Sequence, residues 1–465
     1  MTGMAVLVLL SGFLGDGWVP SGHPLAGWIL ASRASGTGPR PAVYPGWLPP
    51  DAADWLPEGL VERLQSISKP GGTDVDGLGR TGAVLLAAVE AEDSTTLETR
   101  AGLSLDAFLE PVAGLHLRER LSVWASSDER QPGGFTPFHE GAEQGRHLYV
   151  DWGFAAWRRG SFEASAGRIP QVWGPCRYTN LLVSDNAPPM DMLRLAWQPA
   201  RWLGFTSFTS SLDSDSGTYL SAHRLDISPG PWLGLGLSEA ILFASEGLEL
   251  AYMNPVIPWY PVQWNERDDD NAMLAADASV KPFDGLELYG ELLVDDLQYQ
   301  TEWGRPSRLG WTAGAGALAG ATAVTAEYTR IDRFVYSQKH PGNYYLHDGD
   351  IIGSALGPDC DRVTLGVSTA EFWPLTAGLR VEHARHGEGT VSEGYPDSLF
   401  ADDAFPSGIV EHSTGLELDA SIYLGYGLEA HATAARRWIR NLGHVRGEDG
   451  SETEAGIEAV ARFGL

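Results

Sequence analysis

Residues 416–435 read LELDASIYLGYGLEAHATAA. Apolar side chains occupy every second position over 416–424 and again, after a Gly-Tyr-Gly interruption, over 428–434. Successive side chains of a β-strand point to opposite faces, so this period of two predicts two strands joined by a short turn. Polar residues such as Glu417 and Asp419 fill the positions between, which gives each strand one apolar and one polar face.

The same alternation recurs over 101–110, 115–125, 375–382 and 457–465. A soluble sandwich or propeller could carry such strands, and so could a transmembrane barrel, in which the apolar faces meet lipid. The apolar face of 457–465 reaches the last residue, which favours a barrel because no strand edge can stay unpaired in lipid. Roughly 390 residues, at about 20 per strand and connection, predict an all-β antiparallel transmembrane β-barrel of about 18 strands.

The first 76 residues differ from the rest of the chain. An apolar run over 4–14 is too short to cross a bilayer as a helix, and we expect 1–15 to be a signal peptide or its remnant. Residues 16–76 are rich in proline with short helical patterns, and they lack the apolar content to fold alone. We therefore expect a small helical or irregular plug region over 16–76 and an outer-membrane barrel over 77–465.

Charge and cysteine content exclude several classes of function. The formal net charge of −29 disfavours nucleic acid, whose phosphates would be repelled. Cys176 and Cys360 are the only cysteines, so the chain is neither a disulfide scaffold nor a zinc protein. We expect two isolated, buried or half-buried thiols, although a single bridge stays open at this point.

Residues 163–198, EASAGRIPQVWGPCRYTNLLVSDNAPPMDMLRLAWQ, interrupt the strand pattern. Alternation stops at Trp173-Gly174-Pro175 and resumes after Ser184-Asp185-Asn186. Proline cannot donate to a sheet ladder, so an irregular segment is predicted here. Such segments between strands often carry binding residues, because the scaffold fixes them and leaves them accessible. The segment is either a ligand site or a turn that plugs the barrel.

Several of these motifs together resemble the Wzi-type capsule-assembly family of outer-membrane proteins. They are Gly167-Arg168, Trp173-Gly174-Pro175, LLVSDNAP at 181–188, YMNP at 252–255 and YGELLVDD at 289–296. The resemblance implies an 18-stranded barrel in the outer membrane, closed from the periplasmic side by the N-terminal region. It also implies a lectin-like role in holding capsular polysaccharide at the cell surface, without a cofactor. Cys176 departs from the pattern, since a small residue is expected after Trp-Gly-Pro.

Six residues are candidates for ligand binding: Arg168, Trp173, Asn186, Trp259, Tyr260 and Trp264. Arg168 is expected on a lumen-facing strand beside a carboxylate, and Trp173 either packs against the plug or stacks on a sugar. Asn186 is expected to close an Asx turn before Pro188. The three aromatic residues at 259–264 either stack on sugars or join the aromatic belt at the membrane surface.

Catalysis is not expected. Asp268, Asp269 and Asp270 offer hard oxygens for Ca²⁺, but their spacing matches no fixed ligand motif, so they are only weak metal candidates. Asp295 and Asp296 are adjacent in a predicted strand and point to opposite faces, so they cannot flank one glycosidic bond. Nucleophile-elbow, zincin, P-loop and dinucleotide fingerprints are missing from the sequence.

The sequence therefore favours a surface-polysaccharide-binding barrel of the outer membrane that is not an enzyme. Its expected partners are surface polysaccharide, outer-membrane lipid and the barrel assembly machinery, and we expect a monomer. A porin-like channel for small solutes or sugars is the alternative, since the same polar strand faces would line a lumen. A soluble, secreted β-protein is the third possibility.

Overall fold

A computed structural model describes residues 79–464, apart from 93–95, 113, 127–145, 214–216, 246–248, 267–269, 297–306, 395–403 and 426–427. The predictions for 1–15 and 16–76 concern residues outside these ranges. Within the described ranges, no helix is long and apolar enough to cross a membrane.

Eighteen antiparallel strands form one sheet. The first nine are β1 (Gly79–Glu92), β2 (Thr96–Val112), β3 (Leu115–Ser126), β4 (Arg146–Arg159), β5 (Phe162–Ile169), β6 (Met190–Ala200), β7 (Leu203–Asp213), β8 (Thr218–Gly230) and β9 (Leu233–Ala244). The other nine are β10 (Asn271–Phe283), β11 (Leu286–Asp296), β12 (Arg308–Ala319), β13 (Thr322–Ile331), β16 (Cys360–Thr369), β17 (Leu375–His386), β18 (Glu411–Gly425), β19 (Leu428–Arg440) and β20 (Asp449–Gly464).

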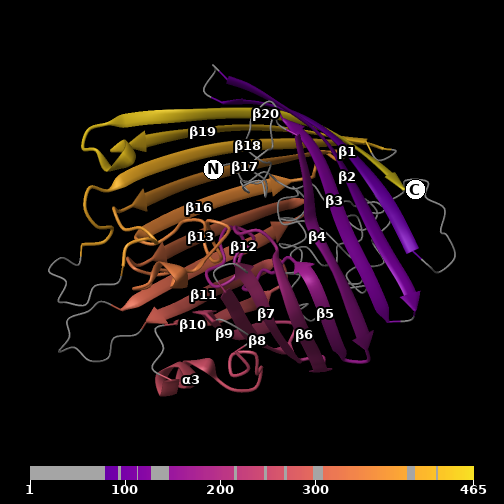
Figure 1. Ribbon diagram of the computed structural model, residues 1–465. Coiled ribbons are helices and arrows are strands. Elements are labelled where there is room, and N and C mark those ends of the chain that lie inside the picture. Colours follow the sequence, from indigo (N-terminus) through magenta and orange to yellow (C-terminus); the bar gives the residue numbers. More distant parts are fainter. Residues whose placement is uncertain are drawn as a thin grey trace.

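Each strand pairs with its neighbours in sequence, and β13 pairs with β16. The last strand, β20, returns to the first, with Cα partners that run from Gly82 opposite Gly464 to Glu92 opposite Glu454. The described strands thus form a ring without a free edge (Figure 1). This confirms the predicted antiparallel barrel of about 18 strands.

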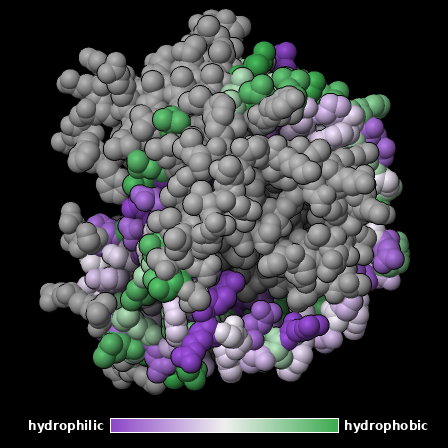
Figure 2. Space-filling model, turned by 90° about the vertical axis from the view of Figure 1, so that its right-hand side faces the viewer, coloured by the Kyte–Doolittle hydropathy of each residue, from purple (hydrophilic) through white to green (hydrophobic). Residues whose placement is uncertain are grey.

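The apolar faces of the strands point outward. Leu416, Leu418 and Leu424 are 36%, 50% and 60% exposed, whereas Glu417 between them forms an ion pair with Arg380. Figure 2 shows hydrophobic side chains exposed at several places on the molecular surface. Among the described residues, exposed leucines lie on β3, β6, β9, β10, β11 and on each strand from β16 to β19. An outer wall of exposed leucine around a polar interior is the pattern of a barrel that lies in lipid.

The two ends of the barrel differ. Tight turns at 160–161, 201–202 and 231–232 join strands at one end, whereas the other end carries the long connections 170–189, 245–270, 332–359 and 387–410. We name this second end the crown. In barrels of this type the long connections face the outside of the cell.

Candidate functional site

Two crown connections fold back into the lumen. The first insert is residues 170–189, between β5 and β6. The second insert is residues 332–359, between β13 and β16, with the short elements η4 (Pro341–Asn343), β14 (Leu346–His347) and β15 (Asp350–Ile351). Both belong to one hydrophobic cluster of nearly fully buried side chains, which also includes residues of the wall.

The inserts are bonded to each other. The Ser184 backbone N–H donates to the Ile352 carbonyl (2.9 Å), and its hydroxyl donates to the Gly353 carbonyl (2.5 Å). The Tyr336 hydroxyl donates to the Leu181 carbonyl (2.6 Å). Since these bonds are buried and join residues more than 150 positions apart, the two inserts form a single packed body.

Carboxyl groups of the barrel wall hold the first insert in place. Glu291 on β11 accepts the backbone N–H groups of Leu181 (3.0 Å) and Leu182 (3.3 Å). Glu327 on β13 accepts the N–H of Arg177 (2.9 Å). An irregular buried backbone has no ladder partners, so its N–H groups need acceptors from elsewhere. The wall supplies them at two separate strands.

A buried arginine of the first insert, Arg177, also binds the insert to the wall. The guanidinium of Arg177 pairs with Glu287 (3.0 Å), donates to Thr325 (3.1 Å) and lies over the ring of Tyr289 (5.4 Å from its centre). Arg177 and Glu287 side chains are only 5% and 9% exposed. The guanidinium also occupies the space beside Gly316, where a Cβ would collide with it. The first insert is therefore anchored through charge as well as through backbone bonds.

The cysteines are free and buried, as expected for isolated thiols. The Cys176 thiol donates to Glu291 over 3.8 Å. Burial, and secondarily the nearby Glu291, raise the pKa of the Cys176 thiol well above its usual value. This thiol is therefore an unreactive packing group in the closed insert.

The candidate residues of the first insert have structural roles. Trp173 is 1% exposed and packs edge-on against Phe208 of β7, with ring centres 5.3 Å apart. Asn186 does not close the predicted Asx turn: its own backbone N–H bonds to the Ser184 hydroxyl (3.0 Å), and its side chain donates to the Ile351 carbonyl (2.8 Å). Trp173 is therefore buried against the barrel wall and offers no face to a sugar, and Asn186 ties the inserts together.

Arg168 has the predicted carboxylate partner, Asp191, at 2.8 Å. The predicted lumen orientation is wrong. Arg168 follows Gly167 and precedes Ile169, which is fully buried in the lumen cluster, and Asp191 alternates in the same way with buried Met190. The pair therefore lies on the opposite, outer face of the wall.

Of the aromatic candidates, Trp259 differs from expectation, whereas Tyr260 is half-buried. Trp259 begins helix α3 (Trp259–Glu266), is fully buried, and lies 4.2 Å from the ring of His223. Glu239 of β9 accepts the N–H groups of Trp259 (3.0 Å) and Tyr260 (2.7 Å). Glu239 is on the same face of β9 as the exposed Leu237, which is the outer face of the wall. The 245–270 connection, which contains α3, therefore covers the outside of the wall, and Figure 1 shows α3 next to β8 and β9.

A buried Trp259 ring has no free face for a sugar, which corrects the stacking prediction for that residue. The side chains of Trp264, Asp268 and Asp269 lie outside the described residues. Asp270 is buried and accepts the Tyr252 hydroxyl (2.8 Å). Across the described part of the chain, no group of three or more His, Cys, Asp or Glu side chains could hold a metal ion.

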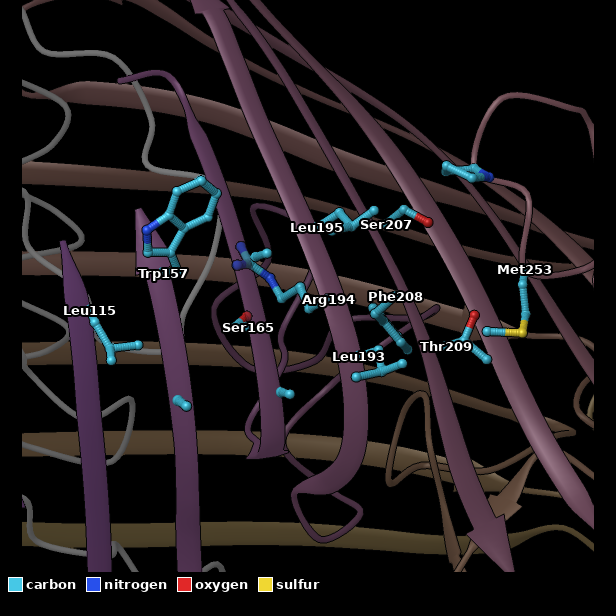
Figure 3. Close-up of a pocket in the computed structure, with 14 residues that line it drawn as sticks. Leu115, Trp157, Ser165, Leu193, Arg194, Leu195, Ser207, Phe208, Thr209 and Met253 are labelled. Atoms are coloured by element: carbon cyan, nitrogen blue, oxygen red, sulfur yellow. The ribbon is translucent and has the colours of Figure 1, made fainter. Parts of the chain in front are cut away.

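A groove of about 430 Å³ lies on the wall at β4–β7 (Figure 3). Its lining includes Trp157, Leu193 and Leu195, which are 43%, 59% and 41% exposed on the outer face. Met253 and Pro255 of the 245–270 connection close one side. A mainly apolar groove on the lipid-facing side does not suit a polysaccharide.

The second insert presents a different surface at the crown, which the sequence reading missed. Lys339, His340 and Asp348 are exposed, and the half-buried Tyr344 donates its hydroxyl to the Ser392 carbonyl (3.0 Å). Burial lowers the pKa of His347 in β14 below its usual value. The only sequence signal was the long polar connection itself.

These features define a class: an outer-membrane β-barrel whose lumen contains two of its own crown connections packed against part of its wall. The profile of the family described as capsule assembly protein Wzi matches residues 88–453, and the chain belongs to this family. It is therefore a protein of the outer membrane. A search of curated proteins finds no match.

The fold is similar to that of solved outer-membrane barrels. The structure described as Wzi, a carbohydrate-binding β-barrel involved in group 1 capsule assembly in Escherichia coli, has a TM-score of 0.66 and 15% identity, covering 95% of this chain and 99% of that one. Pseudomonas aeruginosa OpdK with vanillate has a TM-score of 0.53 and 11% identity, covering 85% and 100%. Pseudomonas aeruginosa OccD3 has 0.51 and 13%, covering 86% and 96%. At these identities the likeness concerns the fold alone.

Proposed function

We propose that this barrel binds surface polysaccharide at its crown as a non-catalytic, lectin-like protein. The observation that carries the proposal is the packed body of the two inserts. The second insert rests on the first, which is fixed to the wall through Glu291 and Glu327. The crown therefore has a rigid floor, and a preformed surface loses little conformational entropy when a ligand binds.

Membership of the Wzi family supports a carbohydrate ligand, since the related Escherichia coli barrel is described as carbohydrate-binding. On the crown, Tyr344 is the aromatic group that we propose as a sugar contact, because its ring is partly exposed beside the polar residues Lys339 and His340. Arg168 lies close enough to His347 of the second insert to act on its charge, and Asn186 supports the same insert through the Ile351 carbonyl. Tyr260 is bonded to Glu239 on the outer wall. The net charge of −29 favours a neutral or cation-bridged polymer.

The non-catalytic part of the proposal rests on the roles of the acidic residues. Asp295 accepts the backbone N–H of Tyr336 (2.7 Å) and pairs with Arg308 (3.2 Å), so it supports the second insert. Asp296 lies next to it in β11 and approaches the same arginine (3.6 Å). Both carboxylates are thereby engaged by structural partners.

Capsule retention tests the proposal. A deletion strain complemented with Tyr344→Ala is expected to release polysaccharide into the medium, whereas complementation with Trp232→Ala should retain it. Trp232 is a matched control because it is an aromatic residue, 55% exposed, in the turn at the opposite end of the barrel. Equal retention by the two variants, together with no binding of the purified protein to capsular glycans, would contradict the proposal.

A porin-like channel is the second candidate, favoured by the fold likeness to the Pseudomonas aeruginosa barrels. Conductance in planar bilayers separates the two functions. The body formed by both inserts should keep the conductance of the intact protein low, and opening it by removing 332–359 should raise the conductance. A large conductance of the intact protein would favour the channel.

A further inference from the structure

A row of charged residues crosses five neighbouring strands on the outside of the wall near the crown. The residues are directly paired from strand to strand: Arg330, Asp361, Arg385, His412 and Arg440 on β13, β16, β17, β18 and β19. These strands lie side by side (Figure 1). The row faces outward because it alternates with residues such as Cys360 and Ile439, whose side chains are buried inside.

Residues nearer the middle of the wall show at which depth of the membrane the charged row lies. Two residues nearer the middle of the wall, Trp438 is 44% exposed on the same face. Further down the exposed residues are mostly apolar, with Leu365, Leu416 and Leu418 at 51%, 36% and 50%. The exception is Arg436, the exposed cross-strand partner of Leu416. Tryptophan marks the boundary between hydrocarbon and headgroups. The charged row lies about 7 Å above that boundary, among the lipid headgroups.

Two arginines of β19 are not neutralised within the described part of the chain: Arg440, which ends the row, and Arg436, which lies four residues nearer the middle of the wall. Arg385 is paired with Asp361 (2.5 Å), but Arg436 and Arg440 are exposed and form no salt bridge with any described carboxylate. Arg436 starts one row below Trp438, and its guanidinium lies over the Trp438 ring, 5.4 Å from the ring centre, so the charge is carried toward the headgroups. Asp449, the cross-strand partner of Arg440, accepts the Asn441 backbone N–H (3.2 Å).

Two histidines complete this patch. The rings of His383 and His412 are 6.0 Å apart, and Thr414 lies at 2.9 Å from the first of them. The chain has a net charge of −29, so a surface patch with two arginines outside any described salt bridge, two histidines and an exposed tryptophan indicates a site for an anionic ligand. Arginine matches the geometry of phosphate oxygens, and it does so most strongly where water is partly excluded.

We propose that Arg436 and Arg440, with Trp438 between them and His383 and His412 beside them, bind the phosphorylated headgroup of a lipid in the outer leaflet. The guanidinium groups contact the phosphate, and the Trp438 ring lies against the start of the acyl chains. The site is on the lipid-facing wall, apart from the crown surface that is proposed for polysaccharide. Its success or failure is therefore independent of glycan binding.

The test uses the full chain in neutral detergent, with lipid A that bears two phosphates as the probe and native mass spectrometry to count bound lipid. The wild-type protein is expected to hold one lipid A, and the double substitution R436Q/R440Q to weaken that binding by about tenfold or more. Arg446→Gln is the control, because Arg446 is an exposed arginine in the turn between β19 and β20, and it should bind as the wild type does.

Three results would overturn the proposal: equal binding by the double variant, equal binding of dephosphorylated lipid A, or displacement of lipid A by inorganic phosphate at matched concentration. The last would assign the patch to a free anion. Heat-modifiable migration on gels reports whether each variant is folded. Arg440→Lys, which keeps the charge and loses the planar fork, provides a milder variant and should weaken binding less than the double substitution.

Discussion

Replacing Glu291 with alanine is expected to loosen the first insert while the barrel stays folded. The carboxyl oxygens of Glu291 accept the backbone N–H groups of Leu181 (3.0 Å) and Leu182 (3.3 Å), and the residue is 5% exposed. The substitution leaves two buried N–H groups without an acceptor, at a cost of about 1–3 kcal/mol each. We therefore expect the free energy of local opening of the insert to fall by about 3 kcal/mol.

The buried thiol of Cys176 reports this opening, because its alkylation by a maleimide requires the insert to leave the lumen. A fall of about 3 kcal/mol corresponds to labelling that is about 100-fold faster. Mass spectrometry of the two cysteine peptides makes Cys360 of β16 an internal control. Glu452→Ala is the matched variant, since Glu452 pairs with Arg437 (3.5 Å) and contacts neither insert. Unchanged labelling in Glu291→Ala would refute the anchoring role.

Three further changes probe the inserts. Arg177→Ala removes the ion pair of the buried Glu287, so it should cost about 3–5 kcal/mol and lower the temperature of the heat-modifiable gel shift. Gly174→Ala should speed labelling of the Cys176 thiol, because Gly174 has φ of +111° and a Cβ there would lie 2.6 Å from the buried amide oxygen of Asn180. Gly349→Ala is the control: φ is +88° but the space around it is open, so labelling should not change. Burial lowers the pKa of His347, so as the pH falls the unfolded chain takes up the proton before the folded chain does. The stability of the second insert should therefore fall as the pH drops below about 6.5. His347→Gln should remove this pH dependence of stability, as measured by hydrogen exchange.

The strands could be predicted from the sequence because alternation is a local property. The apolar positions of 416–424 point outward as their spacing requires. The lumen could not be predicted in the same way. The bond between Tyr336 and Leu181 joins residues 155 positions apart, and no periodicity connects them. Glu291 occupies a polar-face position like many others, and only the register shows that it meets the first insert.

The sequence of β9 contains a feature that predicts the position of α3 on the outer wall. On β9, Leu233, Leu235 and Leu237 form an apolar series that continues with Glu239. A carboxylate in an outward-facing apolar series cannot stay in contact with lipid, so another part of the chain has to cover it. The 245–270 connection does so by giving Glu239 the free N–H groups at the start of α3, where an anion is favoured. The aromatic residues of that connection suggested sugar stacking, but Glu239 in the outward-facing series predicts the position of α3 more accurately.

The lumen and the outer wall use one device for the same physical problem. Irregular segments bring buried backbone N–H groups that no ladder satisfies, and a glutamate on a strand accepts two of them at a time: Glu291 for the first insert and Glu239 for α3. Part of the acidic composition is therefore structural.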